Sequence, residues 1–136
     1  MQVLIDTCVW SQALRRTTDH SNDHARELRD IILDNRACII GPIRQEVLSG
    51  IRVPEHFAFL REHLAAFPDL LIQTIDYENA AAFSNLLRRK GIQGSVIDFL
   101  ICAVADRYSL LIYTLDDDFK YFSKYLSIKL YTPSSK

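Results

Sequence analysis

Long apolar stretches are missing from this sequence. The longest uninterrupted one, FLICAVA at residues 99–105, is far shorter than the roughly 20 residues that a membrane-spanning helix needs. The first residues, MQVLID, show no basic segment followed by a long apolar one, so we expect no signal peptide. Both absences favour a cytoplasmic protein.

Glycine and proline are scarce as well, with four of each among 136 residues. No linker rich in Gly, Pro or Ser divides the chain, and no repeat or low-complexity segment is present. The length and the hydrophobic content of 49% predict a single domain, residues 1–136, that buries an ordinary core. Only TPSSK at residues 132–136 is typical of a loose C-terminal tail.

Cysteine is limited to Cys8, Cys38 and Cys102. An odd number, wide spacing and apolar neighbours are typical of reduced thiols in a reducing compartment. None of the three belongs to a CxxC pair, which argues against a zinc site built from thiolates.

An excess of charge of either sign is missing too, because the formal net charge is −1. This balance alone does not indicate a nucleic-acid partner. If five of the 17 acids belong to one metal site, 12 remain against 16 Lys and Arg residues. The surface outside that site is then net positive by four, which is compatible with a phosphate backbone.

What the chain does contain is a regular alternation of short apolar segments and amphipathic ones. The predicted strands cover residues 2–6, 37–40, 70–75, 110–114 and 127–132. The predicted helices cover residues 21–35, 42–50, 54–67, 77–91, 95–109 and 117–126. This order predicts an α/β fold with a central parallel sheet of about five strands, flanked by helices on both faces.

Acidic residues stand where these elements meet one edge of the sheet. Asp6 closes the first strand, and Asp116 follows the fourth. The second and fifth helices begin at the same edge and bring Glu46 and Asp98 there. Ligands of parallel sheets bind beyond the carboxyl ends of the strands. We therefore expect these four acids to meet in one crevice, with Asp118 close behind.

Each of these acids also has a plain structural explanation. Ser95 and Asp98 match the capping-box pattern of a helix start, and an acid that closes a strand, as Asp6 does, is commonly paired with a backbone amide or an arginine. Several carboxylates in one crevice nevertheless repel one another unless a cation lies among them. An all-oxygen set of ligands selects Mg²⁺ or Mn²⁺ over zinc or copper.

Three consecutive aspartates follow the fourth strand in LLIYTLDDDFKYF, residues 110–122. Because neighbouring side chains point in different directions, we expect Asp116 and Asp118 to turn toward the site and Asp117 to face solvent. Acids at a helix start also gain about 0.3–1 kcal/mol each from the helix dipole.

Together these motifs resemble the PIN-domain ribonucleases, and most closely the VapC-type toxins of toxin–antitoxin pairs. The resemblance covers nearly the whole chain and rests on LIDTCVW, GPIRQEVLSGI, GSVIDFLICAVA and LLIYTLDDDF. The first and last are the specific motifs. The resemblance implies a Mg²⁺- or Mn²⁺-dependent endoribonuclease that hydrolyses RNA phosphodiester bonds, forms a dimer and is neutralised by an antitoxin protein.

The resemblance also assigns residues by their position in these motifs. The catalytic acids of the family, which also bind the metal, correspond to Asp6, Glu46, Asp98 and Asp116. Asp118 corresponds to a fifth, more variable metal-binding acid, and Thr7 and Thr114 to hydroxyl residues that orient the acids or contact the phosphate. Cys8 departs from the family, which commonly has asparagine there. We expect Cys8 to alter the packing near Asp6 without abolishing activity.

Two other functions remain open. A phosphatase of the haloacid-dehalogenase type also begins with an Asp after its first strand, but it needs a second acid two residues on, where this chain has Cys8. A PIN-like module that binds RNA or protein without catalysis would be marked by loss of the acids, and all four are present.

Some further patterns have ordinary explanations. His20 and His24 could bind a metal on a helix, yet a solvated helix start accounts for them. The runs Arg15–Arg16 and Arg88–Lys90 are typical of solvated faces, although the first could reach an RNA backbone. A stripe in the third predicted helix is typical of a core or a dimer interface rather than a surface for stacking bases: Phe57, Leu60, Leu64 and Phe67.

Overall fold

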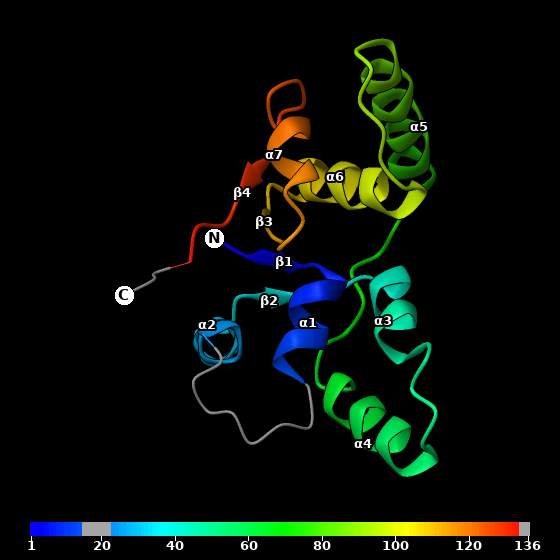
Figure 1. Ribbon diagram of the computed structural model, residues 1–136. Helices are drawn as coiled ribbons and strands as arrows, with labels where there is room; N and C mark the ends of the chain where they lie inside the picture. The colour runs from blue at the N-terminus through cyan, green and yellow to red at the C-terminus, as the bar shows by residue number, and fades with distance from the viewer. Residues whose placement is uncertain (15–22, 134–136) are drawn as a thin grey trace.

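Four short parallel strands form the centre of the molecule (Figure 1). The computed structural model describes residues 1–14 and 23–133. Its strands are β1 (Val3–Ile5), β2 (Ala37–Cys38), β3 (Leu111–Tyr113) and β4 (Lys129–Leu130). They lie in the order β2-β1-β3-β4, and every pair is parallel. The predicted parallel sheet is confirmed, with four strands instead of about five.

The segment predicted as a further strand, residues 70–75, is not one. It touches the sheet at a single bridge between Ile39 and Asp69, where the N–H of Leu70 donates to the carbonyl of Ile39 at 2.9 Å. A helix begins at Thr74 because Asp76 accepts the backbone N–H of Gln73 at 2.9 Å. The last two residues of the predicted strand, 74 and 75, therefore belong to this helix.

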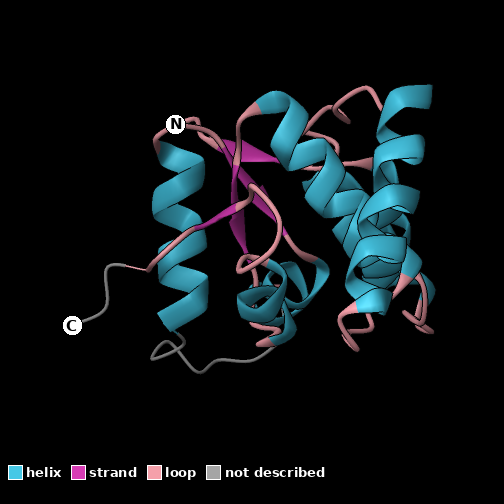
Figure 2. Ribbon diagram, turned by 90° about the horizontal axis from the view of Figure 1, so that it is seen from above, coloured by secondary structure: helices cyan, strands magenta, loops and turns pink. Residues whose placement is uncertain are grey.

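Helices lie on both sides of the strands (Figure 2), as the sequence predicted. Within the described residues they are α1 (Thr7–Ala13), α2 (Asp23–Leu33), α3 (Gly41–Leu48), α4 (Pro54–Leu64), α5 (Thr74–Arg89), α6 (Val96–Tyr108) and α7 (Asp118–Phe122). Helix α1 was not predicted. Its start is fixed by Asp6, whose side chain accepts the backbone N–H of Thr7. The other helices match predicted ones with shifted ends.

Burial explains why the edge of the sheet is held firmly. All three residues of β1 are fully buried, as expected for a parallel strand with neighbours on both sides and helices on both faces. Helix α6 is buried from Phe99 to Ala105 and packs against β3 and α5. The ends of β1 and β3 and the start of α6 are therefore rigid supports for side chains.

The remaining features of the chain agree with a small domain of ordinary packing. All three cysteines are free, although only Cys102 is fully buried. In the described ranges, no helix has the length and apolar character needed to cross a membrane. Of the predicted tail, Thr132 and Pro133 belong to no helix or strand, and the last three residues lie outside the described part.

Candidate active site

Asp6 lies at the carboxyl edge of the sheet, where hydrogen bonds hold it beside the ends of two strands. Its backbone N–H donates to the carbonyl of Tyr113 at 2.9 Å, which places the end of β1 beside the end of β3. Its Oδ1 accepts the N–H of Thr7 at 2.7 Å, and its Oδ2 accepts the hydroxyl of Thr114 at 2.7 Å. The side chain is buried, so the orientation of this carboxylate is fixed.

Thr114 also anchors the loop that carries Asp116. While its hydroxyl donates to Asp6, its Oγ1 accepts the backbone N–H of Asp116 at 3.0 Å. Oδ1 of Asp116 in turn accepts the N–H of Asp118 at 2.9 Å. One threonine hydroxyl thus links the acid after β1 to the acid after β3.

Glu46 reaches the same edge from α3. It is exposed, and its Oε1 accepts the hydroxyl of Thr7 at 2.7 Å. Because Thr7 follows Asp6 directly, this bond brings the Glu46 side chain to the start of α1. Thr7 and Thr114 therefore each donate a hydroxyl hydrogen bond to one of the acids.

Asp98 lies in the first turn of α6 and is half-buried. The capping box is present: the Asp98 N–H donates to Oγ of Ser95 at 3.0 Å, and Asp98 Oδ2 accepts the Ser95 N–H at 3.1 Å. Burial raises the pKa of Asp98, the hydrogen bonds from Ser95 lower it, and the negative charges of Asp6 and Asp116 raise it further. The structure thus places three carboxylates from three distant segments within electrostatic reach of one another.

The other two aspartates of the triple run are placed differently. The side chain of Asp117 is 82% exposed and pairs with Lys120 at 3.2 Å, so it faces solvent. Asp118 is exposed at the start of α7, and its backbone N–H rather than its carboxylate contacts Asp116. Hydrogen bonds through Thr114 connect Asp116 to Asp6, whereas Asp118 is connected to Asp116 only through its backbone N–H and lies at the margin of the acid cluster.

No basic side chain of the described residues forms a salt bridge with the clustered acids, Asp6, Glu46, Asp98 and Asp116. Glu46, Asp98 and Asp116 each use one oxygen to accept a hydrogen bond. Their second oxygens accept none within the described part of the chain. A carboxylate held in this way has lone pairs left for a cation.

The donor set fits a hydrated oxygen-loving ion better than a closed metal site. In the two described ranges, no group of three or more His, Cys, Asp and Glu side chains is arranged to hold an ion by itself. Mg²⁺ usually keeps several waters and uses only one or two carboxylates, whereas structural zinc is enclosed by four ligands. Oxygen-only donors without a salt bridge among the described residues suit a divalent cation that keeps part of its water.

Cys8 contacts Asp6, the residue near which the sequence led us to expect altered packing. Its half-buried thiol donates to Oδ2 of Asp6 at 3.6 Å, and its sulfur accepts the N–H of Leu115 at 3.4 Å. Burial and the nearby charge of Asp6 raise the pKa of the Cys8 thiol. A neutral thiol therefore supports both the Asp6 carboxylate and the loop after β3.

The remaining sequence candidates do not join this site. His24 is half-buried, with its Nδ1 2.9 Å from the hydroxyl of Tyr113, so the prediction of a solvated helix start is wrong for this residue. Its predicted companion His20 lies outside the described residues, as do Arg15 and Arg16. The basic run at the end of α5, from Arg88 to Lys90, is exposed as predicted.

The apolar stripe of α4 belongs mainly to the core. Leu60 and Leu64 are buried, and Phe67 beyond the helix packs edge-on against Trp10 with ring centroids 5.2 Å apart. Phe57 is half-buried under Arg61. This stripe is not a surface for stacking bases.

Comparisons with known proteins agree with this fold. The family model described as PIN domain matches residues 3–125. No curated protein sequence matches the chain.

Solved structures resemble the whole chain at low sequence identity. FitAcB from Neisseria gonorrhoeae is 19% identical over 97% of this chain and 98% of its own, with a TM-score of 0.77. VapBC2 from Rickettsia felis, bound to a DNA fragment from its promoter, is 16% identical over 96% and 98%, with a TM-score of 0.75. A toxin–antitoxin complex from Klebsiella pneumoniae is 21% identical over 87% and 90%, with a TM-score of 0.60. At these identities the likeness shows a shared fold.

Proposed function

Because the chain belongs to the PIN domain family, whose members are generally nucleases, we propose that it is a metal-dependent endoribonuclease and the VapC-type toxin of a toxin–antitoxin pair. The observation that carries this proposal is the convergence of Asp6, Asp98 and Asp116 at one edge of the sheet, where Thr114 links Asp6 to Asp116 and none of the three has a salt bridge among the described residues.

The roles of the acids follow from how each is held. Asp6, Glu46, Asp98 and Asp116 would hold Mg²⁺ or Mn²⁺, with Asp118 at the margin reaching it through water. The bound ion would neutralise charge on the phosphate and make a bound water more acidic. Thr7 and Thr114 keep the carboxylates oriented through the hydrogen bonds described above.

Hydrolysis needs a base for the attacking water. Asp98 and Asp116 are the candidates, since each has an oxygen that accepts no hydrogen bond within the described residues. Water adds to phosphorus, its proton passes to the base, and the bond from phosphorus to one ribose oxygen breaks. One RNA fragment keeps the phosphate and the other leaves with a hydroxyl.

Protein partners are part of the proposal. The similar structure from Klebsiella pneumoniae is a toxin–antitoxin complex, which supports an antitoxin partner for this chain. The resemblance described above supports a homodimer. Exposed apolar side chains on α2 and α4, Leu33 and Phe59, are suited to protein contacts. The free cysteines support a cytoplasmic location.

The test is cleavage of single-stranded RNA by the purified protein in millimolar Mg²⁺ or Mn²⁺ and in EDTA. We expect cleavage that requires the ion and disappears in the Asp6→Asn variant. RNA binding without cleavage would support the non-catalytic module instead. Cleavage that continues in EDTA would exclude the metal-dependent mechanism.

A further inference from the structure

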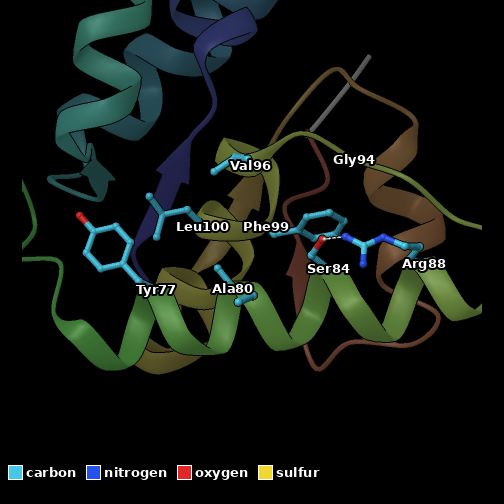
Figure 3. Close-up of a pocket in the computed structure, with 9 residues that line it drawn as sticks. Tyr77, Ala80, Ser84, Arg88, Gly94, Val96, Phe99 and Leu100 are labelled. Atoms are coloured by element: carbon cyan, nitrogen blue, oxygen red, sulfur yellow. Dashed lines mark hydrogen bonds between the residues drawn. The ribbon is translucent and has the colours of Figure 1, made fainter.

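A groove runs between α5 and the first turns of α6 (Figure 3). Its volume is about 400 Å³, which lies in the range of small-ligand sites. The α5 side of the groove is one face of the helix. The lining residues that matter below are Tyr77, Ala80, Ser84, Arg88, Gly94 and Phe99.

The lining of this groove includes two aromatic rings, and the side chains along its middle are small. Tyr77 and Arg88 stand at opposite ends of the row along α5, with the small Ala80 and Ser84 between them (Figure 3). Tyr77 is 56% exposed, so its ring is available to a ligand. Phe99 is buried and packs on Phe122 with ring centroids 5.1 Å apart.

The backbone of Gly94 lies close to the rings of Phe99 and Phe122, which is possible because glycine has no side chain. A Cβ at this position would lie 2.7 Å from Cζ of Phe122 and 3.0 Å from Cζ of Phe99. A side chain at this position would require the ring of Phe122 or of Phe99 to shift. The absence of a side chain at Gly94 therefore preserves the positions of both rings.

The charge of the groove is positive. Arg88 is its only charged lining residue within the described part. The guanidinium donates to two neutral oxygens, Oδ1 of Asn85 at 3.1 Å and Oγ of Ser84 at 3.4 Å, and takes part in no salt bridge there. A smaller, polar hollow of about 230 Å³ continues past Arg88 and adds Gln93. The groove thus combines an apolar part with an uncompensated cation and a polar extension.

The groove and the acid cluster share one helix start. Gly94 and Phe99 line the groove, and between them in sequence lies the capping box of Ser95 and Asp98. Neighbouring residues on a helix point about 100° apart. The groove, which Phe99 lines, and Asp98 therefore lie on adjacent sides of the first turns of α6.

We propose that the groove binds a nucleotide of the RNA strand next to the cleaved bond, with its base against the exposed ring of Tyr77 and a phosphate on Arg88. This inference rests on the proposed function, because it takes RNA as the substrate. Stacking of bases on aromatic side chains beside a basic groove is how proteins hold single strands without reading sequence. Arginine is well suited to phosphate because its planar fork donates two hydrogen bonds at once. An apolar side chain of a protein partner would leave the charge of Arg88 unused.

The test compares Tyr77→Ala, Tyr77→Phe and Arg88→Gln with Arg89→Gln, which removes the neighbouring charge outside the groove lining. Each is measured for cleavage kinetics on a single-stranded RNA of mixed sequence. Binding of the same fluorescent RNA is measured by anisotropy in an Asp6→Asn background. The molar mass in solution is measured by light scattering. We expect Tyr77→Ala and Arg88→Gln to raise KM and Kd about tenfold at unchanged kcat, while Tyr77→Phe and Arg89→Gln stay near the parent.

The outcomes separate this inference from the proposed function. If the parent cleaves RNA but the groove variants keep its KM and Kd, the groove inference is wrong and the nuclease stands. If Tyr77→Ala lowers the molar mass and leaves RNA binding unchanged, the groove is an interface with a second copy, and the inference is again overturned. If the parent neither binds nor cleaves RNA, both fail.

Discussion

Asp6 and Asp98 are held in opposite ways although both belong to the acid cluster. Asp6 is buried and accepts hydrogen bonds at both oxygens. Asp98 is half-buried and uses one oxygen for the capping box. The position of Asp6 is therefore fixed, whereas the pKa of Asp98 is raised by burial and, to a smaller extent, by the charges of Asp6 and Asp116.

We predict that Asp6→Asn and Asp98→Asn each lower kcat for RNA cleavage by about a hundredfold or more. Because each change removes one charge from a self-repelling cluster, the unfolding free energy without metal should stay the same or rise. Cleavage rates and urea unfolding measure the two effects. Asp106→Asn, at the exposed end of the same helix, is the matched control. A variant that cleaves at the parental rate would show that its residue has another role.

The triple aspartate gives a second prediction at this scale. Asp116 is tied to Thr114, Asp118 lies at the margin, and Asp117 pairs with Lys120 in solvent. Replacing each by Asn should cost activity in the order Asp116, then Asp118, with little effect at Asp117. Cleavage rates at saturating Mg²⁺ measure this order. An Asp117→Asn variant as inactive as Asp116→Asn would move the site by one residue.

Among the elements, α5 and α6 are joined by a buried ion pair that the sequence did not reveal. Nε and Nη2 of Arg107 donate to the two oxygens of Asp76 at 2.7 and 2.8 Å, and the Asp76 side chain is fully buried. Arg107 is the main cause that lowers the pKa of Asp76 below its usual 3.8. This pair fixes α5 against the helix that carries Asp98.

The ion pair makes stability depend on pH. A carboxylate whose pKa is lower in the folded state stabilises above its unfolded pKa, and this contribution is lost as pH falls through the folded value. We predict that Asp76→Asn lowers the unfolding free energy at pH 7 by about 1.5 kcal/mol, since it removes a charge-assisted hydrogen bond but leaves Arg107 partly open to solvent. Urea unfolding should show this difference shrinking as pH falls below 3.8.

Asp117→Asn is the control for this pair, because the exposed pair with Lys120 should contribute about 0–1 kcal/mol. An effect of Asp76→Asn that is equal at neutral and acid pH would mean that packing, and not charge, is lost.

Elements with a clear start signal were predictable from the sequence, and those without one were not. Ser95 and Asp98 predicted the start of α6, and the capping box is there. Helix α1 was missed because Asp6 had been assigned to the end of a strand, although the same residue also caps a helix.

The predicted strand at residues 70–75 failed for a related reason. Its apolar composition was visible, but the cap formed by Gln73 and Asp76 depends on a buried acid whose partner, Arg107, lies far along the chain. The expectation that the acids lie at one edge of the sheet followed from the directions of the predicted strands and helices alone. The thiol of Cys8 and the groove beside α6 depend on side-chain packing that no sequence pattern encodes.

At the scale of the whole molecule, the parallel sheet brings acids to one edge, where they have no salt bridge among the described residues. A ligand bound only by the folded state raises stability by mass action, by about 2.7 kcal/mol at a hundred times its Kd. We predict that Mn²⁺ at that level raises the melting temperature by roughly 10 °C.

The rise should shrink in Glu46→Gln and persist in Glu78→Gln, which changes an exposed acid on α5. Differential scanning calorimetry measures it. An equal rise in all three proteins would place the ion away from Glu46.

The most direct measurement is an anomalous difference map from a crystal soaked with Mn²⁺. The account predicts a peak among the carboxylates of Asp6, Glu46, Asp98 and Asp116, with waters completing the coordination. A saturated soak that gives no peak there, or a peak held by other residues, would contradict the central claim that these four acids form the metal site.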